Sequence, residues 1–255
     1  MSNPEDPLES NLLRDGFVHL PAAIPSDVLA AADSFATTRE ASIHFDGRGW
    51  GQCFAPDAVL IALVESCRAT IERLRGSPLC RLGVPPHPMA PHRDVGQLAY
   101  VRAAATCRGY NAHVDGAPYP GQLQLTRHAA LLGVALTPAL DANCGNFVVW
   151  PRSHRRIARA LHELPPGSDG VGALRAGWPV LEDETPERLR LAAGDAVLLH
   201  ALTLHGTACR TRPGTRRMAF FRLDARRLAS DDLAGFADLW SDWQGIDAAL
   251  RAMHD

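Results

Sequence analysis

The chain has 255 residues, of which 46% are hydrophobic and 21% are charged, and its formal net charge is -2 at pH 7. This composition is typical of a soluble globular protein with a sizeable core, and the near-zero charge gives no reason to expect attraction to nucleic acid or to a membrane surface. All 26 basic residues counted as Lys or Arg are arginine. No lysine is therefore present to form a Schiff base or to anchor a carboxylate.

The six cysteines show no Cys-x-x-Cys spacing, and residues 1–6 lack the basic start and apolar run of a signal peptide. A reducing, cytoplasmic location is therefore expected. The longest uninterrupted apolar stretch, residues 129–136, is strand-sized and well short of the roughly 18 residues that a membrane span needs.

The N-terminal part of the chain predicts helices that support a sheet. Residues 16–20 have the pattern of a short strand, and residues 28–35 that of a helix capped by Ser26 or Asp27. A second helix is expected over residues 56–74, because a proline stands near its first turn and Gly-Ser-Pro at 76–78 would end it. We expect both helices to pack outside the sheet.

From residue 97 the pattern changes to short strand-like runs separated by turns. The runs are residues 97–102, 112–116, 125–136, 147–150, 196–200, 203–209 and 217–223. Such spacing predicts a mainly β protein with flanking helices, built as a barrel or a double-sheet jelly roll. Residues 164–187, rich in Gly, Pro and acids, are expected to form an irregular insertion near the mouth of the barrel.

The C-terminal residues 231–253 have apolar positions near helical spacing, which predicts an amphipathic helix or helix pair packed on the barrel. We therefore expect a single domain over residues 1–255. Its parts would be an N-terminal helical support over roughly 1–95, a β core over roughly 96–224 and a C-terminal helix over roughly 228–253.

One local motif carries the chemistry. His113 and Asp115 are separated by one residue, so in an extended strand their side chains share a face and can bind one metal ion. With His205 from a distant strand they would form the two-histidine, one-carboxylate triad associated with non-haem Fe(II). Arg216, eleven residues after His205, offers a charged fork that binds a carboxylate bidentately. The set predicts iron with a dicarboxylate co-substrate, 2-oxoglutarate.

Other residues compete for these roles. The His-x-Asp spacing recurs at His44 and His92, so the spacing alone is weak. His200 is an alternative third ligand, but it lies five residues before His205 and would face the other way on one continuous strand. Arg217 competes with Arg216 as the carboxylate anchor.

Five motifs in order along the chain resemble the phytanoyl-CoA dioxygenase-like branch of the Fe(II)/2-oxoglutarate oxygenases. They are His113-Val-Asp115, Gly145-Asn-Phe-Val-Val-Trp-Pro-Arg-Ser-His154, Gly194-Asp195-Ala-Val, His205-Gly-Thr207 and Arg216-Arg-Met. The resemblance covers residues 16–223. One departure is Arg152, which stands where the family's Pro-Gly-Ser-His turn has glycine.

The resemblance implies a cupin-like double-stranded β-helix in which His113, Asp115 and His205 bind iron and Arg216 binds the far carboxylate of 2-oxoglutarate. Thr207 is similar in placement to the hydroxyl residue that assists this arginine. The family's lysine-assisted contacts have no lysine to match here, and Gln97 is a further candidate for contact with the co-substrate.

The implied activity is a dioxygenase that uses O2 to hydroxylate a small-molecule metabolite or natural-product intermediate, with release of succinate and CO2. The carboxylate of Asp115 favours hydroxylation over halogenation, because related halogenases have a small residue at that position. A monomer or homodimer without nucleic-acid or membrane partners is expected. Two alternatives stay open: a cupin-like metalloenzyme that acts without 2-oxoglutarate, and a noncatalytic metabolite-binding member of the fold.

Overall fold

The structure, a computed structural model, describes residues 7–79, 82–83, 96–107, 109–115, 125–165, 185–224, 226–228 and 239–246. The helices in these ranges are α1 (Pro7–Asp15), α2 (Ser26–Glu40), α3 (Ala58–Arg75) and α4 (Ser153–His162). The strands are β1 (Phe17–Leu20), β2 (Trp50–Ala55), β3 (Leu82–Gly83), β4 (Gly96–Arg102), β5 (Leu125–Arg127), β6 (Ala130–Ala135), β7 (Phe147–Val149), β8 (Glu187–Arg188), β9 (Ala196–His200), β10 (His205–Thr207), β11 (Thr215–Leu223) and β12 (Arg226–Leu228).

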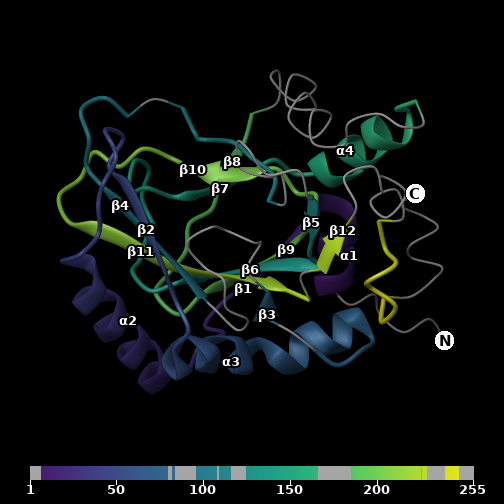
Figure 1. Ribbon diagram of the computed structural model, residues 1–255, viewed down its shortest axis with the longest axis horizontal. Helices are drawn as coiled ribbons and strands as arrows, with labels where there is room; N and C mark the ends of the chain where they lie inside the picture. The colour runs from purple at the N-terminus through teal and green to yellow at the C-terminus, as the bar shows by residue number, and fades with distance from the viewer. Residues whose placement is uncertain are drawn as a thin grey trace.

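The described strands pair antiparallel throughout. The larger sheet has the order β1-β9-β6-β11-β4-β2, with β3 also paired to β11, and a smaller sheet has the order β10-β7-β8. In Figure 1 the smaller sheet lies on one side of the larger sheet, and helices α2 and α3 lie on the other. The expectation of a mainly β protein with flanking helices is confirmed.

The inner face of the larger sheet packs on the smaller sheet. Alternate residues of β11, Met218 and Phe220, lie in one buried apolar cluster with Phe147 and Val149 of β7. The rings of Phe147 and Phe220 have centroids 5.4 Å apart. Since side chains alternate along a strand, the residues of β11 in this register, from Arg216 on, all face the smaller sheet.

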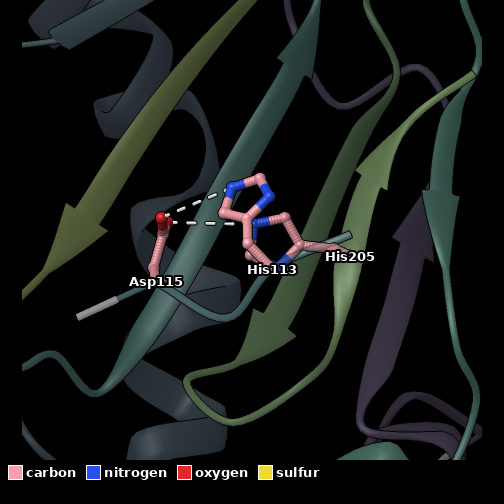
Figure 2. Close-up of side chains that lie close together, drawn as sticks. All are labelled: His113, Asp115 and His205. Atoms are coloured by element: carbon pink, nitrogen blue, oxygen red, sulfur yellow. Dashed lines mark ion pairs between the residues drawn. The ribbon is translucent and has the colours of Figure 1, made fainter. Parts of the chain in front are cut away.

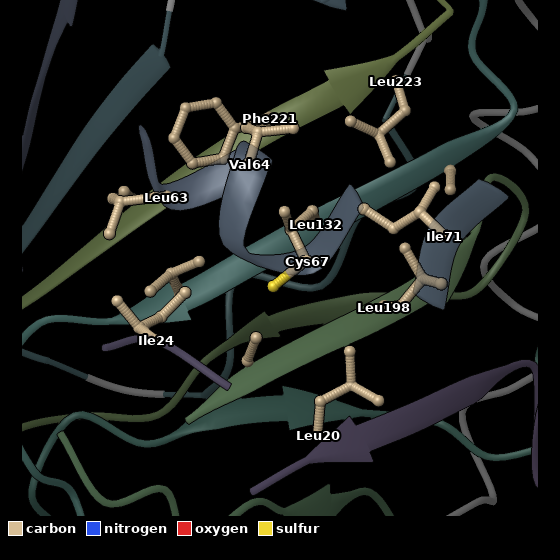
Figure 3. Close-up of a cluster of buried hydrophobic side chains, with 14 of the residues drawn as sticks. Leu20, Ile24, Leu63, Val64, Cys67, Ile71, Leu132, Leu198, Phe221 and Leu223 are labelled. Atoms are coloured by element: carbon tan, nitrogen blue, oxygen red, sulfur yellow. The ribbon is translucent and has the colours of Figure 1, made fainter. Parts of the chain in front are cut away.

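The outer face of the larger sheet is covered by α3, whose apolar residues recur at helical spacing (Figure 3). Leu63, Val64 and Ile71 of this helix pack against strand residues such as Leu132 and Phe221, and all five are fully buried. Each such side chain contributes roughly 1.5–3 kcal/mol by leaving water. The prediction that the helices pack outside the sheet is therefore confirmed.

The ends of α3 follow local chemistry. The side chain of Asp57 accepts a hydrogen bond from the backbone N–H of Val59 at 2.9 Å, and Gly76 ends the helix in the left-handed conformation with φ 69°. The predicted stop is right. By contrast, α2 begins at Ser26 after Pro25, with no side-chain cap bond, so the predicted cap by Ser26 or Asp27 is wrong.

Several predicted strands are shorter or broken. In place of a strand over 112–116, His113 forms an isolated bridge, and the run 125–136 divides into β5 and β6. The last strand begins earlier, at Thr215. Helix α1 and strand β2 were not predicted, because α1 buries only Leu12 and Leu13 and β2 lacks a regular alternation of buried residues.

The predicted C-terminal helix is described only over 239–246, where the chain forms turns instead. The N–H of Trp243 bonds the carbonyl of Trp240 at 2.9 Å, and that of Ile246 bonds the carbonyl of Trp243 at 3.2 Å. The apolar residues at every third position therefore lie in consecutive turns rather than in one helix. Most of the predicted insertion, residues 166–184, lies outside the described residues.

Arg152 has φ 67°, the left-handed conformation that glycine adopts most easily. The turn before α4 thus keeps a glycine-like backbone with an arginine in it. Within the described ranges no helix is both long and apolar enough to cross a membrane.

Candidate metal centre

His113, Asp115 and His205 come together as the sequence predicts, although the described residues 112–115 form no regular strand. The N–H of His113 bonds the carbonyl of His205 at 2.9 Å, and the reverse bond measures 3.0 Å. This bridge places the two imidazole centroids 4.5 Å apart. His205 is buried, whereas 45% of the His113 side chain is exposed, so the site opens on the His113 side.

The three side chains converge on one point (Figure 2). Nε2 of His113 lies 3.8 Å from Oδ1 of Asp115, and Nε2 of His205 lies 3.9 Å from Oδ2. The candidate ligand atoms all lie within 4.8 Å of one another. Two imidazole nitrogens and one carboxylate oxygen at this spacing can bind a single ion and leave other coordination positions open.

Both imidazoles are held in the tautomer that a metal requires. Nδ1 of His113 lies 2.8 Å from the carbonyl of Asn111, and Nδ1 of His205 lies 2.9 Å from the carbonyl of Thr203. A carbonyl can only accept, so Nδ1 carries the proton and Nε2 keeps its lone pair toward Asp115.

The local electrostatics favour the ligating charge states. Burial lowers the pKa of His205 to about 3, with a further contribution from the nearby His113. Burial alone would raise the pKa of Asp115, but Arg222, His205 and His113 hold this pKa well below its usual range. The carboxylate is therefore ionised and the buried imidazole neutral, as metal binding demands.

Arg222 was missed in the sequence reasoning. Its Nη2 donates to Oδ1 of Asp115 at 3.0 Å and lies 2.9 Å from Oδ2, while Nη1 donates to the amide oxygen of Gln97 at 2.5 Å. Nε2 of Gln97 in turn donates to Oε1 of Gln52 at 2.5 Å. The alternation of side chains along β11 could have indicated Arg222, since this residue shares the inner face with Met218 and Phe220.

Arg216 lies on the same inner face and is only 1% exposed. Among the described residues none of its three guanidinium nitrogens has a hydrogen-bond partner. Burial, with Arg210 nearby, lowers its pKa to about 9. A buried, unpaired guanidinium costs several kcal/mol, so this position is built to receive an anion.

The neighbouring Arg217 has the opposite orientation. Its Nε donates to Asp33 at 2.8 Å, and its Nη1 donates to Glu40 at 3.1 Å, both on α2. The competition between Arg216 and Arg217 is thus decided by strand alternation: one arginine faces the smaller sheet and the other faces a helix.

A pocket has Trp50, Val101, Asn111 and Thr207 among its lining residues. Arg216 is the register partner of Val101, which is itself the partner of Trp50, so all three side chains lie on one face of the sheet. Thr207 follows His205 by two residues on β10. The pocket is therefore lined by residues from the sheet face that carries Arg216 and by Thr207 of the strand that carries His205.

A disulfide joins Cys107 and Cys209, which are 102 positions apart in the sequence. The spacing of the cysteines did not predict it. Cys107 lines the pocket, and the bond ties the segment that leads into His113 to the segment that follows His205.

Two further candidate site residues, His200 and Gln97, are bonded to other protein groups. Nε2 of His200 lies 2.7 Å from the carbonyl of Leu239, and its Nδ1 accepts from the N–H of Leu202 at 3.1 Å. His200 is therefore structural, as expected. The amide of Gln97 is occupied by Arg222 and Gln52, and its contact with a co-substrate stays a prediction.

No protein-family model and no curated protein matches this chain. Solved structures do match. The non-haem, α-ketoglutarate-dependent carbocyclase SnoK from nogalamycin biosynthesis aligns with TM-score 0.62 and 18% identity over 90% of this chain and 87% of its own. The epimerase SnoN, solved with Fe3+, α-ketoglutarate and nogalamycin RO, aligns with TM-score 0.61 and 20% identity over 92% and 89%.

The chain has the fold of non-haem, 2-oxoglutarate-dependent enzymes. A third match, HygX from Streptomyces hygroscopicus with nickel and 2-oxoglutarate bound, has TM-score 0.54 and 16% identity over 86% of each chain. At these identities the likeness establishes the fold alone.

Proposed function

We propose that this protein is a non-haem Fe(II)- and 2-oxoglutarate-dependent oxygenase of the phytanoyl-CoA dioxygenase-like type, acting on a small molecule. The observation that carries the proposal is the buried, unpaired guanidinium of Arg216 on the sheet face that fronts the metal-binding strand. A triad alone fits several metal enzymes, but a triad with an anion-binding group near it fits a chelating dicarboxylate.

The donor set fits Fe(II). His113 and His205 would bind the ion through Nε2, because each Nδ1 is bonded to a backbone carbonyl. Asp115 would bind through one carboxylate oxygen, since both oxygens face the imidazoles, Oδ1 toward His113 and Oδ2 toward His205. Bound Fe(II), with 2-oxoglutarate and O2, supplies the oxidising power for attack on a substrate C–H bond, with succinate and CO2 as by-products.

In this proposal Arg216 binds the far carboxylate of 2-oxoglutarate. The side chain of Thr207, which lines the pocket together with Val101 of the larger sheet, would add a hydroxyl donor. The inner sheet face around them is apolar, with Ala99, Met218 and Phe220 in one buried cluster. Such surroundings strengthen the pairing of the guanidinium with a carboxylate by excluding water.

We further propose that the facing antiparallel sheets form a double-stranded β-helix and that residues 1–255 are one domain. The substrate is proposed to be a natural-product intermediate. SnoN was solved with nogalamycin RO and HygX with hygromycin B, which supports this class. Hydroxylation is the reaction we predict, while the names of SnoN and SnoK denote an epimerase and a carbocyclase on the same fold.

Calorimetric titration of 2-oxoglutarate into Ni(II)-loaded protein tests the anchor. We expect Arg216→Met to weaken binding about 30-fold or more, because truncating one partner of a buried charge pair costs about 2–5 kcal/mol. Arg217→Met, which removes the adjacent arginine from the outer face, should bind 2-oxoglutarate like the wild type.

Thermal unfolding gives the folding control. Without 2-oxoglutarate, Arg216→Met should unfold at the same temperature as the wild type or higher, since it removes an uncompensated buried charge. Wild-type binding of 2-oxoglutarate by Arg216→Met would refute the anchor. A wild type that binds Ni(II) but not 2-oxoglutarate would favour the cupin-like enzyme that acts without this co-substrate.

A further inference from the structure

Asp115 lies in a turn, two residues beyond the backbone bridge between His113 and His205. The histidines are thus fixed to each other by two backbone hydrogen bonds, whereas the carboxylate is fixed through its side chain. The group that holds it is Arg222, which comes from a different sheet. This division matters because the three open positions of a facial triad depend on how the carboxylate is oriented.

Arg222 is itself rigidly placed. Its backbone lies in β11 with register partners on two sides, Leu131 of β6 and Gly83 of β3. Its side chain is 10% exposed, and its Nη1 is bonded to Gln97, whose amide is bonded to Gln52. The guanidinium therefore reaches Asp115 from a polar chain that crosses β2, β4 and β11.

The Nη2 atom of Arg222 lies between the two carboxylate oxygens of Asp115. It lies 3.0 Å from Oδ1 and 2.9 Å from Oδ2 of Asp115, nearly equidistant from the two oxygens. A metal ion bound by both oxygens of one carboxylate would also sit nearly equidistant from them. The guanidinium therefore competes for that bidentate position, and the ion is left one oxygen.

We propose that Arg222, held by Gln97 and Gln52, is a positioning residue that restricts Asp115 to one-oxygen metal binding and so keeps a coordination position open for the co-substrate. The proposal rests on the proposed metal site and adds residues to it that the triad motif does not contain. Partners that orient metal ligands commonly change metal affinity or activity by about 10- to 100-fold when mutated.

Cobalt(II) reports the coordination directly, because the intensity and position of its visible bands depend on the number and arrangement of ligands. Metal-free protein would be loaded with Co(II), and 2-oxoglutarate would then be titrated anaerobically. For Arg222→Met we expect altered cobalt bands and 2-oxoglutarate binding weaker by about tenfold or more. Arg222→Lys keeps the charge but not the planar fork, so its cobalt bands and its 2-oxoglutarate affinity should lie between those of the wild type and those of Arg222→Met.

Arg217→Met is the matched control, since it removes a carboxylate-paired arginine from the same strand but from the outer face. It should leave the cobalt spectrum and the 2-oxoglutarate affinity unchanged. Gln97→Leu keeps Arg222 and Asp115 but removes the support of the guanidinium. It should shift the bands in the same direction by a smaller amount, and it keeps the test available if Arg222→Met does not fold.

A folded Arg222→Met or Gln97→Leu with wild-type cobalt bands and 2-oxoglutarate affinity within twofold of wild type would overturn the positioning role. That result leaves the metal site intact. By contrast, a wild type that binds no Co(II) at all would overturn the proposed function itself, so the two failures are distinguishable.

Discussion

At the scale of single residues, the two histidines share one local device. Nδ1 of each is bonded to the carbonyl two residues earlier in the chain, Asn111 for His113 and Thr203 for His205. A short backbone loop thus fixes both the tautomer and the ring plane. The buried member of the pair is also harder to protonate, since burial lowers the pKa of His205 to about 3.

This shift predicts a pH dependence of stability in the metal-free protein. The unfolded chain binds a proton at His205 near pH 6.5, whereas the folded chain does so only near pH 3. Between these values the unfolded state binds more protons, so stability falls as the pH falls. From pH 6.5 to 5.0 the loss from this residue should be on the order of 1–2 kcal/mol.

Urea unfolding of wild type and His205→Gln at both pH values measures this contribution. The glutamine variant cannot titrate at position 205, so its stability should fall less steeply while all other groups contribute equally. Equal slopes for the two proteins would contradict the assignment of a buried, neutral His205.

Residue spacing and strand alternation were sufficient to predict that His113, Asp115 and His205 lie together and that Arg216 faces inward, while their roles stay predictions. Arg222 was not predicted, although it continues the same alternation. Its contact with Asp115 joins residues 107 positions apart, and this depends on how the two sheets face each other. Gln97 was predicted for contact with the co-substrate, while its bonds to Arg222 and Gln52 were not.

At the scale of elements, the two segments that carry His113 and His205 are joined twice. The bridge between His113 and His205 pairs their backbones. The disulfide between Cys107 and Cys209 joins the same two segments a few residues away from this bridge. The segment 109–115 contains no regular strand, so these two links replace the continuous ladder that the alternation predicted.

We expect the disulfide to stabilise the fold and the metal site together. Replacing both cysteines, Cys107→Ser with Cys209→Ser, should lower the free energy of unfolding by about 2–5 kcal/mol and weaken Co(II) binding. Denaturant unfolding of the variant and of oxidised and reduced wild type measures the effect, and reduced wild type should match the variant.

Cys53→Ser changes a thiol that is free in the structure and should respond to reductant like the wild type. Unfolding curves for oxidised wild type that superimpose on those of the double variant would contradict the stabilising role of the disulfide.

The elements also show where sequence patterns stop being informative. Helix α3 was predicted almost to its ends, because its apolar stripe is long and Gly76 ends it in the left-handed conformation. Residues 239–246 have a similar apolar spacing but form turns, since Trp240 and Trp243 pack around the buried His200. Tertiary packing, rather than local propensity, decides that segment.

At the scale of the whole molecule, two sheets supply complementary parts of the site. The larger sheet contributes Arg216 and Arg222 from one strand, and the smaller sheet contributes His205 and Thr207. A mainly β protein could be anticipated from strand spacing, but the facing of these side chains required the packing of one sheet on the other. The fold is similar to that of SnoK over 90% of the chain at 18% identity, so this fold tolerates replacement of most of its residues.

The most direct test of the central claim is anaerobic titration of the Fe(II)-loaded wild type with 2-oxoglutarate, followed by visible absorption spectroscopy. Chelation of Fe(II) by the keto acid produces a weak metal-to-ligand charge-transfer band. We predict that this band appears in the wild type, saturates at one 2-oxoglutarate per protein, and requires far more 2-oxoglutarate in Arg216→Met. Bound iron without any such band in the wild type would contradict the account.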